Sequence, residues 1–136
     1  MNNHIYLSDN QFEKEFEACT LPPSLFSHEA HIRLAWIHIR KYGVDTAVEN
    51  ICNQLQQYVI QAGASDKYNI TLTIAAIKIV NHFVEKSNSD DFLEFITEFP
   101  LPITGFKELV AAHYNKVDIF KSLAAKSTFW EPDIAF

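Results

Sequence analysis

The chain has 136 residues, of which 48% are hydrophobic and 21% charged, and its formal charge at neutral pH is −6. This composition is typical of a globular domain, and the acidic charge argues against a general nucleic-acid-binding surface, which needs a basic stripe. The sequence contains no signal-peptide pattern and no apolar run long enough to span a membrane, so we expect a cytoplasmic protein with no membrane partner.

Helical periodicity recurs along the whole chain, and residues typical of helix caps mark its boundaries. Only 3 glycines are present, fewer than a β-sandwich or barrel with many tight turns usually needs. The stretches "TLPPS" and "FPLPITG" predict breaks because Pro cannot continue a helix. Helices are predicted from Ser8 to Cys19, over residues 28–42, 45–62 and about 69–86, in a segment after the "SNSDD" turn, and over residues 106–114 and 118–126.

These elements predict an all-α fold, a compact irregular bundle of five to seven helices in a single domain, residues 1–136. Residues 1–8 and 127–136 are expected to be irregular tails. Ser8 and Ser27 are candidate N-caps, and Gln11 stands at capping-box spacing from Ser8. The second and fourth helices are apolar enough to lie centrally. Cys19 and Cys52 are expected to be small core residues, because no C-x-x-C pair suggests a metal or redox site.

Three histidines occur in the apolar stretch "SLFSHEAHIRLAWIHIRKYG", residues 24–43. Counting about 100° per residue predicts that His28 points into the middle of the buried face and that His31 and His38 lie at its edge. His28 and His31 stand at i, i+3 spacing in the first turn, where side chains can converge and free amides favour an anion or a polarised oxygen. This pair is the candidate catalytic centre, with acid/base roles.

Several other basic residues are expected to lie at the surface or in a tail. A solvated helix face is predicted for Arg33, Arg40 and Lys41. His38 and His82 are expected near the surface and His4 in a frayed terminus.

The inward polar residues of the fourth helix also collect at its N-terminal end, where Asn69 and Thr73 share nearly one direction. If the two helix starts approach each other, four polar side chains would form one pocket in apolar surroundings, typical of a small-ligand site. Aromatic walls would come from residues such as Trp36, Tyr42 and Tyr68. The pocket would be lined by His28, His31, Asn69 and Thr73.

A structural interpretation of the same residues competes with this one. A core histidine can bond to a backbone carbonyl, Thr73 can bond to a carbonyl of its own helix, and Asn69 can be a helix cap. The "HEAH" stretch does not have the H-E-x-x-H spacing of zinc proteases, and no third ligand accompanies His28 and His31. We therefore predict no metal site, with a site on these two histidines as the alternative.

The stretch "FSHEAHIRLAW", followed by "KYNITLT" and "FWEPD", resembles an uncharacterised family of small all-helical bacterial proteins. That family has the patterns F-x-H-x-x-H-x-R-x-A-W and K-Y-H-E-T-x-T and a late F-x-x-P-D tail. The resemblance spans residues 26–133 and implies a site without assigning an activity. It implicates the matching residues His28, His31, Arg33, Trp36, Tyr68, Thr71, Pro132 and Asp133.

One departure from the family pattern bears on mechanism. Asn69 and Ile70 stand where the family has His-Glu, and Asn69 cannot act as a general base near neutral pH. This departure argues against a metal site and against enzymatic activity in this chain.

Three functions follow from the sequence. The leading hypothesis is a small-molecule-binding helical protein, with an acid/base enzyme acting on a carbonyl or carboxylate compound as its catalytic form. Its ligand-binding residues would be Asn69, Thr73, Tyr68, Thr71, Trp36 and Arg33. The second is a non-enzymatic interaction or assembly protein, a homo-oligomer formed through the aromatic tail "FWEPDIAF". The third is divalent-metal binding. No cofactor is identified.

Overall fold

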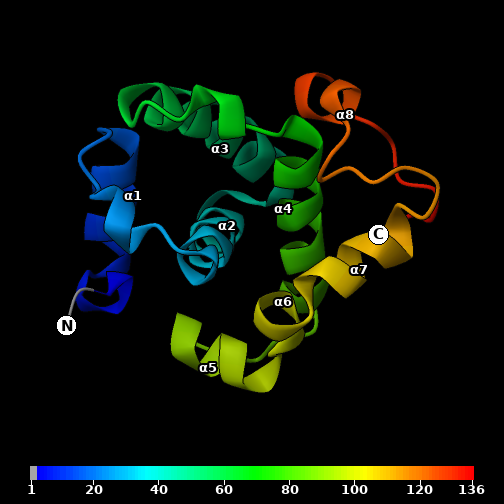
Figure 1. Cartoon of the computed structure of the whole chain (residues 1–136). Coiled ribbons are helices and arrows are strands. Elements are labelled where there is room, and N and C mark those ends of the chain that lie inside the picture. Colours follow the sequence, from blue (N-terminus) through cyan, green and yellow to red (C-terminus); the bar gives the residue numbers. More distant parts are fainter. Residues whose placement is uncertain (1–2) are drawn as a thin grey trace. The chain divides into compact units, whose positions relative to one another are not determined.

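The computed structural model describes residues 3–136, which fall into two units that meet between Tyr68 and Asn69 (Figure 1). Within these described residues there are eight α-helices and no β-strand, which confirms the all-α prediction. The predicted count of five to seven helices is too low, because the break at "FPLPITG" contains a short helix of its own. The single-domain prediction stays a prediction.

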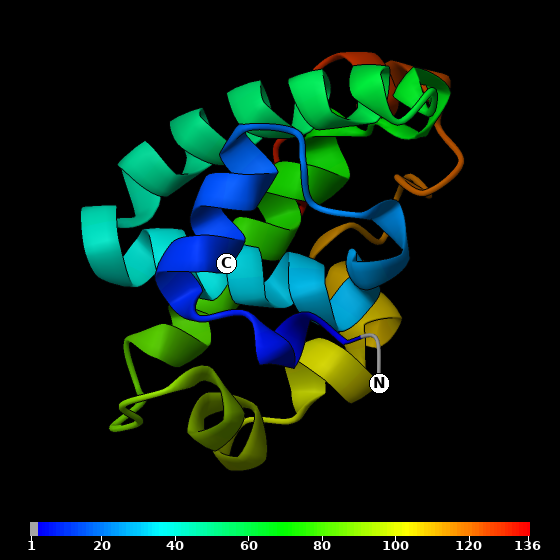
Figure 2. The same cartoon turned by 90° about the vertical axis from the view of Figure 1, so that its left-hand side faces the viewer.

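The first unit consists of three α-helices with short 3-10 turns before, between and after them (Figure 2). Helix α2 packs against both α1 and α3. In chain order the elements are η1 (His4–Tyr6), α1 (Asp9–Glu17), η2 (Pro23–Leu25), α2 (His28–Tyr42), α3 (Val44–Gln61) and η3 (Ser65–Lys67).

Local hydrogen bonds set the helix boundaries of this unit. The Ser8 hydroxyl accepts from the Gln11 amide and the Ser27 hydroxyl accepts from the Ala30 amide, so both predicted N-caps are confirmed. The capping box is incomplete, because the Gln11 side chain donates to Glu15 instead. Gly43, with φ +86° and ψ 165°, ends α2 and begins α3 as a single joint residue.

Aromatic rings form the centre of the first unit. Phe16 lies 4.9 Å from Phe26 and 4.8 Å from Tyr58, measured between ring centroids. The Tyr58 hydroxyl donates to the Leu21 carbonyl oxygen over 2.8 Å, so its polar end is satisfied inside the protein. Phe12 and Phe16 are fully buried, and each contributes roughly 1.5–3 kcal/mol of hydrophobic stabilisation.

The second unit contains five helices, two of them very short. Helix α4 contacts α7 and α8, α5 contacts α6, and α6 contacts α7. The elements are α4 (Ile70–Val84), α5 (Phe92–Glu98), α6 (Leu101–Thr104), α7 (Phe106–His113) and α8 (Leu123–Ser127).

The core of the second unit joins α4 to α7, α8 and the loop between them, with Ala75, Ile79, Val110, Tyr114, Ile119 and Ala125 buried together. Asn69 caps α4 and Asp91 caps α5 through their side-chain oxygens. The predicted helix from 118 to 126 begins later than expected. Asp118 accepts from the Phe120 amide in a local turn, and Ser122 is the N-cap that starts α8.

Both tails form hydrogen bonds with the rest of their own unit. Residues 1 and 2 lie outside the described residues, and the rest of the predicted N-terminal tail includes the 3-10 turn η1. At the other end, Ser127 still belongs to α8, and the segment 128–136 is irregular but hydrogen-bonded within its own unit. The irregular segment 128–136 is therefore held in place by hydrogen bonds.

Candidate functional site

The start of α2 carries the two histidines singled out by the sequence. The turn η2 contains Pro23 and is followed by Phe26 and the cap Ser27, which places His28 at the first helical position. Both His28 and His31 are exposed. The prediction that His28 points into the core is therefore wrong: in the first turn of α2 it is Ala30 that is buried.

Phe26 holds the His31 ring in place. The two rings are stacked, with centroids 3.8 Å apart and an interplanar angle of 22°. Phe26 itself packs against Phe16 and Tyr58 in the core of the unit. The His31 imidazole thus has one face fixed on an aromatic ring that the core anchors, while water reaches the rest.

The His31 ring is neutral at pH 7. Desolvation by the surrounding protein and the nearby His28 lower the pKa of His31 to about 4. More than a third of the residue remains accessible to water, which screens part of this effect. A neutral imidazole offers one N–H donor and one nitrogen acceptor, so His31 can bind a polar ligand from either side.

A buried polar cluster lies next to this pair, and it overturns two predictions. His4 is 2% exposed rather than frayed, and Arg33 is 5% exposed rather than solvated. The Arg33 guanidinium donates to the carbonyl oxygens of His4 and Leu7, each over 2.7 Å, and to Asp9 Oδ1 over 2.9 Å. Glu29 contacts His4 Nε2 at 2.7 Å. Arg33, expected to bind a ligand, instead binds the N-terminal segment.

His38 is also misplaced by the sequence. It was expected at the periphery, yet it is completely buried, and neither of its ring nitrogens has a hydrogen-bond partner among residues 3–136. Burial lowers the pKa of His38, the Glu13 carboxylate acts in the opposite direction, and the Lys41 cation lowers it further. His38 is therefore a neutral core residue.

The predicted aromatic walls do not gather at the start of α2. Trp36 is buried, and the Arg40 guanidinium lies 4.8 Å from its ring. Tyr42 is exposed at the far end of α2, where its hydroxyl donates to Glu13 Oε2 over 2.5 Å. Tyr42 and His28 are 14 residues apart, which is about 21 Å along a helix.

Tyr68 follows α3 in the chain and contacts Gln56 and Cys52 of that helix. Its hydroxyl accepts from Gln56 over 3.5 Å, and burial together with the neighbouring Cys52 strongly raises the pKa of Tyr68. Burial also raises the pKa of the Cys52 thiol, so this cysteine is an unreactive core residue, as expected. Cys19, in contrast, is only half-buried and has a φ of +60°.

In the second unit, the predicted site residues serve the fold. Asn69 caps α4 with its oxygen and donates its amide to the Ile119 carbonyl over 2.7 Å. Thr73 donates to the Asn69 carbonyl, as the structural interpretation predicts. Thr71 donates to the Thr128 carbonyl and accepts from the Trp130 amide. Asp133 accepts from two backbone amides that follow α7, those of Asn115 and Lys116.

The predicted pocket would take His28 and His31 from the first unit and Asn69 and Thr73 from the second, and it stays a prediction. The same holds for an oligomer formed through the aromatic tail. Trp130 and Ile134 are partly exposed, but the segment around them is bonded to its own unit through Thr71 and His113. No role beyond this segment emerges for Pro132.

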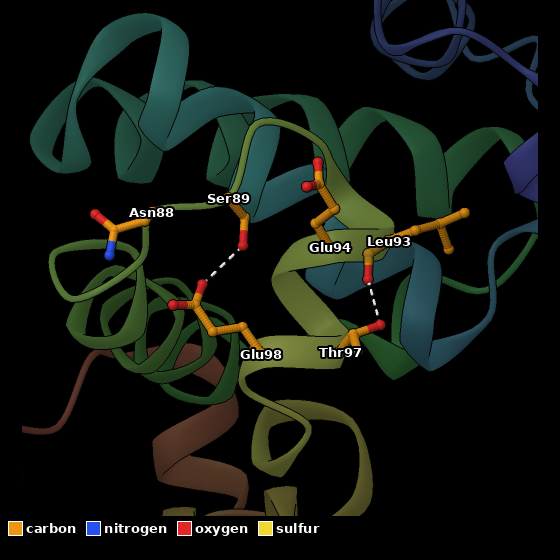
Figure 3. Close-up of a pocket in the computed structure, with 6 residues that line it drawn as sticks. All are labelled: Asn88, Ser89, Leu93, Glu94, Thr97 and Glu98. Carbon is orange, nitrogen blue, oxygen red and sulfur yellow. Dashed lines mark hydrogen bonds between the residues drawn. The ribbon is translucent and has the colours of Figure 1, made fainter.

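A surface pocket of about 470 Å³ lies at α5 and was not predicted (Figure 3). Ser87 and Ser89 each donate a hydroxyl to Glu98 Oε1 over 2.7 Å, and these bonds lower the pKa of Glu98. The carboxylate facing the pocket is thus already bound by its own chain. The only sequence signal was the "SNSDD" turn. The lining residues are Asn88, Ser89, Leu93, Glu94, Thr97 and Glu98.

Among residues 3–136, no three His, Cys, Asp or Glu side chains are grouped so that they could hold a metal ion. None of the helices in that range combines the length and apolar character needed to cross a bilayer.

Comparisons with known proteins assign no family. No protein-family model, no curated protein and no solved structure matches this chain. The resemblance to the family with the F-x-H-x-x-H-x-R-x-A-W pattern stays a prediction.

Proposed function

We propose that this chain binds a small molecule at the start of α2, with His28 and His31 as its polar contacts. The observation that carries the proposal is the His31 ring, which is exposed and neutral and is held by stacking on Phe26 at 3.8 Å. A ring fixed in this way loses little side-chain entropy when it binds a ligand.

The chemistry of the site favours a ligand with a carbonyl or carboxylate group. Two imidazoles at i, i+3 spacing can contact one such group, and the first turn of a helix attracts negative or polarised oxygen. With its pKa lowered to about 4, His31 is a weak base at pH 7. Hydrogen bonding to a ligand is therefore a better-supported role for His31 than proton transfer. His28 would carry any acid/base step.

A thermal-shift screen with carbonyl and carboxylate metabolites tests this proposal. A ligand at one hundred times its Kd adds about 2.7 kcal/mol of stability, which raises the Tm of a chain of this length by several degrees. We expect this shift to fall strongly in His28→Ala and His31→Ala. His82→Ala is the matched control, because His82 is also an exposed helical histidine.

The result that would contradict the proposal is equally specific. A ligand whose shift is the same in the parent, His28→Ala and His31→Ala binds elsewhere. A screen in which no carbonyl or carboxylate compound raises the Tm also counts against it.

A further inference from the structure

The segment before α1, residues 3–8, is bound to α2 by hydrogen bonds from Arg33 and forms an N-terminal strap. Its turn η1 is closed by the Leu7 amide, which donates to the His4 carbonyl over 3.0 Å. The Arg33 guanidinium of α2 holds the strap by donating to the carbonyls of His4 and Leu7. Asp9, the first residue of α1, accepts from the same guanidinium. One arginine thus binds three oxygens on and beside the strap.

The geometry around His4 determines where its proton lies. Arg33 Nη1 lies 3.3 Å from His4 Nδ1, and a guanidinium nitrogen can only donate. His4 Nδ1 must therefore be the acceptor, without a proton. The other ring nitrogen, Nε2, lies 2.7 Å from Glu29 Oε1 and carries the hydrogen that it donates to this carboxylate. The closed strap requires the neutral Nε2–H form of His4.

A second proton on His4 has no place in this arrangement. It would put an N–H at Nδ1 directly against the Nη1 hydrogens of a permanently charged guanidinium, within a site where His4 is 2% exposed. Burial is the main reason that the pKa of His4 is lowered, the Arg33 charge adds to it, and the Glu29 hydrogen bond acts in the opposite direction.

The groups that face His4 come from α1 and α2. Glu29 and Arg33 belong to α2, and Asp9 of α1 reaches the cluster through Arg33. The Phe12 ring of α1 lies 5.9 Å from the imidazole and 4.9 Å from the Arg33 guanidinium carbon. Of these charged groups among residues 3–136, Glu29 favours the protonated form and Arg33 opposes it.

We infer that the N-terminal strap is a pH-sensitive closure, which opens when His4 takes up a second proton and then uncovers Arg33 and Glu29 beside the start of α2. The opened segment of α2 gains an accessible guanidinium. This inference is independent of the proposed ligand, because it needs only the strap and α2.

Histidine-detected NMR combined with amide exchange tests this inference on the full chain. At pH 8 we expect His4 as the Nε2–H tautomer. On acidification, the protection factor of the Leu7 amide, corrected for its intrinsic exchange rate, falls by up to about tenfold per pH unit below the ordinary histidine pKa of 6.5. The Ala47 amide, which donates to the Gly43 carbonyl in α3, is the internal reference and keeps its protection over the same range.

Two variants assign the effect to His4. His4→Gln keeps a neutral donor toward Glu29 and cannot be protonated, so Leu7 protection becomes independent of pH. Glu29→Gln keeps an oxygen acceptor but removes the charge that favours imidazolium in the closed strap, so acidification lowers Leu7 protection further than it does in the parent. His82→Gln, in the second unit, leaves the parent profile unchanged.

Several outcomes would overturn the inference. They are an Nδ1–H tautomer of His4 at pH 8, a parent-like acid transition in His4→Gln, and an acid-induced loss of protection in Glu29→Gln that is equal to or smaller than that in the parent. If His4→Gln proves too unstable to measure, Glu29→Gln decides the question alone.

Discussion

At the scale of single residues, His38 stands out because its interior position conflicts with its chemistry. An imidazole has two nitrogens that seek hydrogen bonds, and in the described chain neither finds one. The ring lies 5.4 Å from Tyr42, whose hydroxyl is already bound to Glu13. A buried polar group without a partner costs about 1–3 kcal/mol, so His38 lowers the stability of the first unit.

We predict that His38→Leu stabilises the protein by about 1–3 kcal/mol at pH 7, measured by urea unfolding. Because the pKa of His38 is lowered in the folded state, the parent loses stability as the pH falls from 6.5 toward that lowered value. The variant does not share this loss, so the difference grows on acidification.

The control for this prediction is His82→Leu, in which an exposed histidine is replaced and no comparable gain is expected. A His38→Leu protein that is less stable than the parent at pH 7 would show that the two nitrogens are satisfied in solution.

Residue positions in α2 were hard to predict for a physical reason. Every residue from Ile32 to Ile39 is buried, including Arg33 and His38. A helix buried on all sides has no polar face, so counting 100° per residue cannot decide which direction is inward. The bonds that would have placed Arg33 and His4 join residues 29 apart in sequence, and no local pattern reports them.

At the scale of elements, the boundaries were predictable where they depend on adjacent residues. Ser8, Ser27, Asn69 and Asp91 each accept a hydrogen bond from an amide three residues later. Helix α6 was missed because Pro100 and Pro102 signal a break, although Pro is also tolerated in the first turn of a helix.

Gly43 is the element-scale feature most open to a direct test. A Cβ at this position would have no atom within 4 Å, so space is not the constraint. Its φ of +86° and ψ of 165° belong to a region that is essentially restricted to glycine. We predict that Gly43→Ala destabilises the protein by about 1–3 kcal/mol in urea unfolding, through backbone strain alone.

Ala64→Gly provides a comparison, because Ala64 has an ordinary negative φ of −128° and its change should cost less. If Gly43→Ala were as stable as the parent, the joint between α2 and α3 would not depend on this backbone conformation.

At the scale of the whole molecule, the open question is whether the two units unfold together. Each contains one of the two tryptophans, Trp36 in the first unit and Trp130 in the second. Trp36 is buried, whereas Trp130 is 37% exposed, so their fluorescence reports on different surroundings. The sequence predicts one domain because 136 residues suit a single core.

We predict that Trp36→Phe and Trp130→Phe, each of which retains one tryptophan, give fluorescence transitions of the same shape in urea. In both variants the fluorescence midpoint has the same offset from the circular-dichroism midpoint. Coincident transitions are the mark of two-state unfolding. If the offset between the fluorescence midpoint and the circular-dichroism midpoint differed between the two variants, each unit would be a separate folding domain.

The single-residue joint at Gly43 also limits how the chain length can vary. An extra residue between α2 and α3 would turn α3 by about 100° about its axis and carry its buried residues Ile51, Leu55 and Tyr58 away from the core. The turn at residues 85–91, between α4 and α5, has no such shared residue. Insertions, tags or engineered loops are therefore best tolerated in that turn and least tolerated beside Gly43.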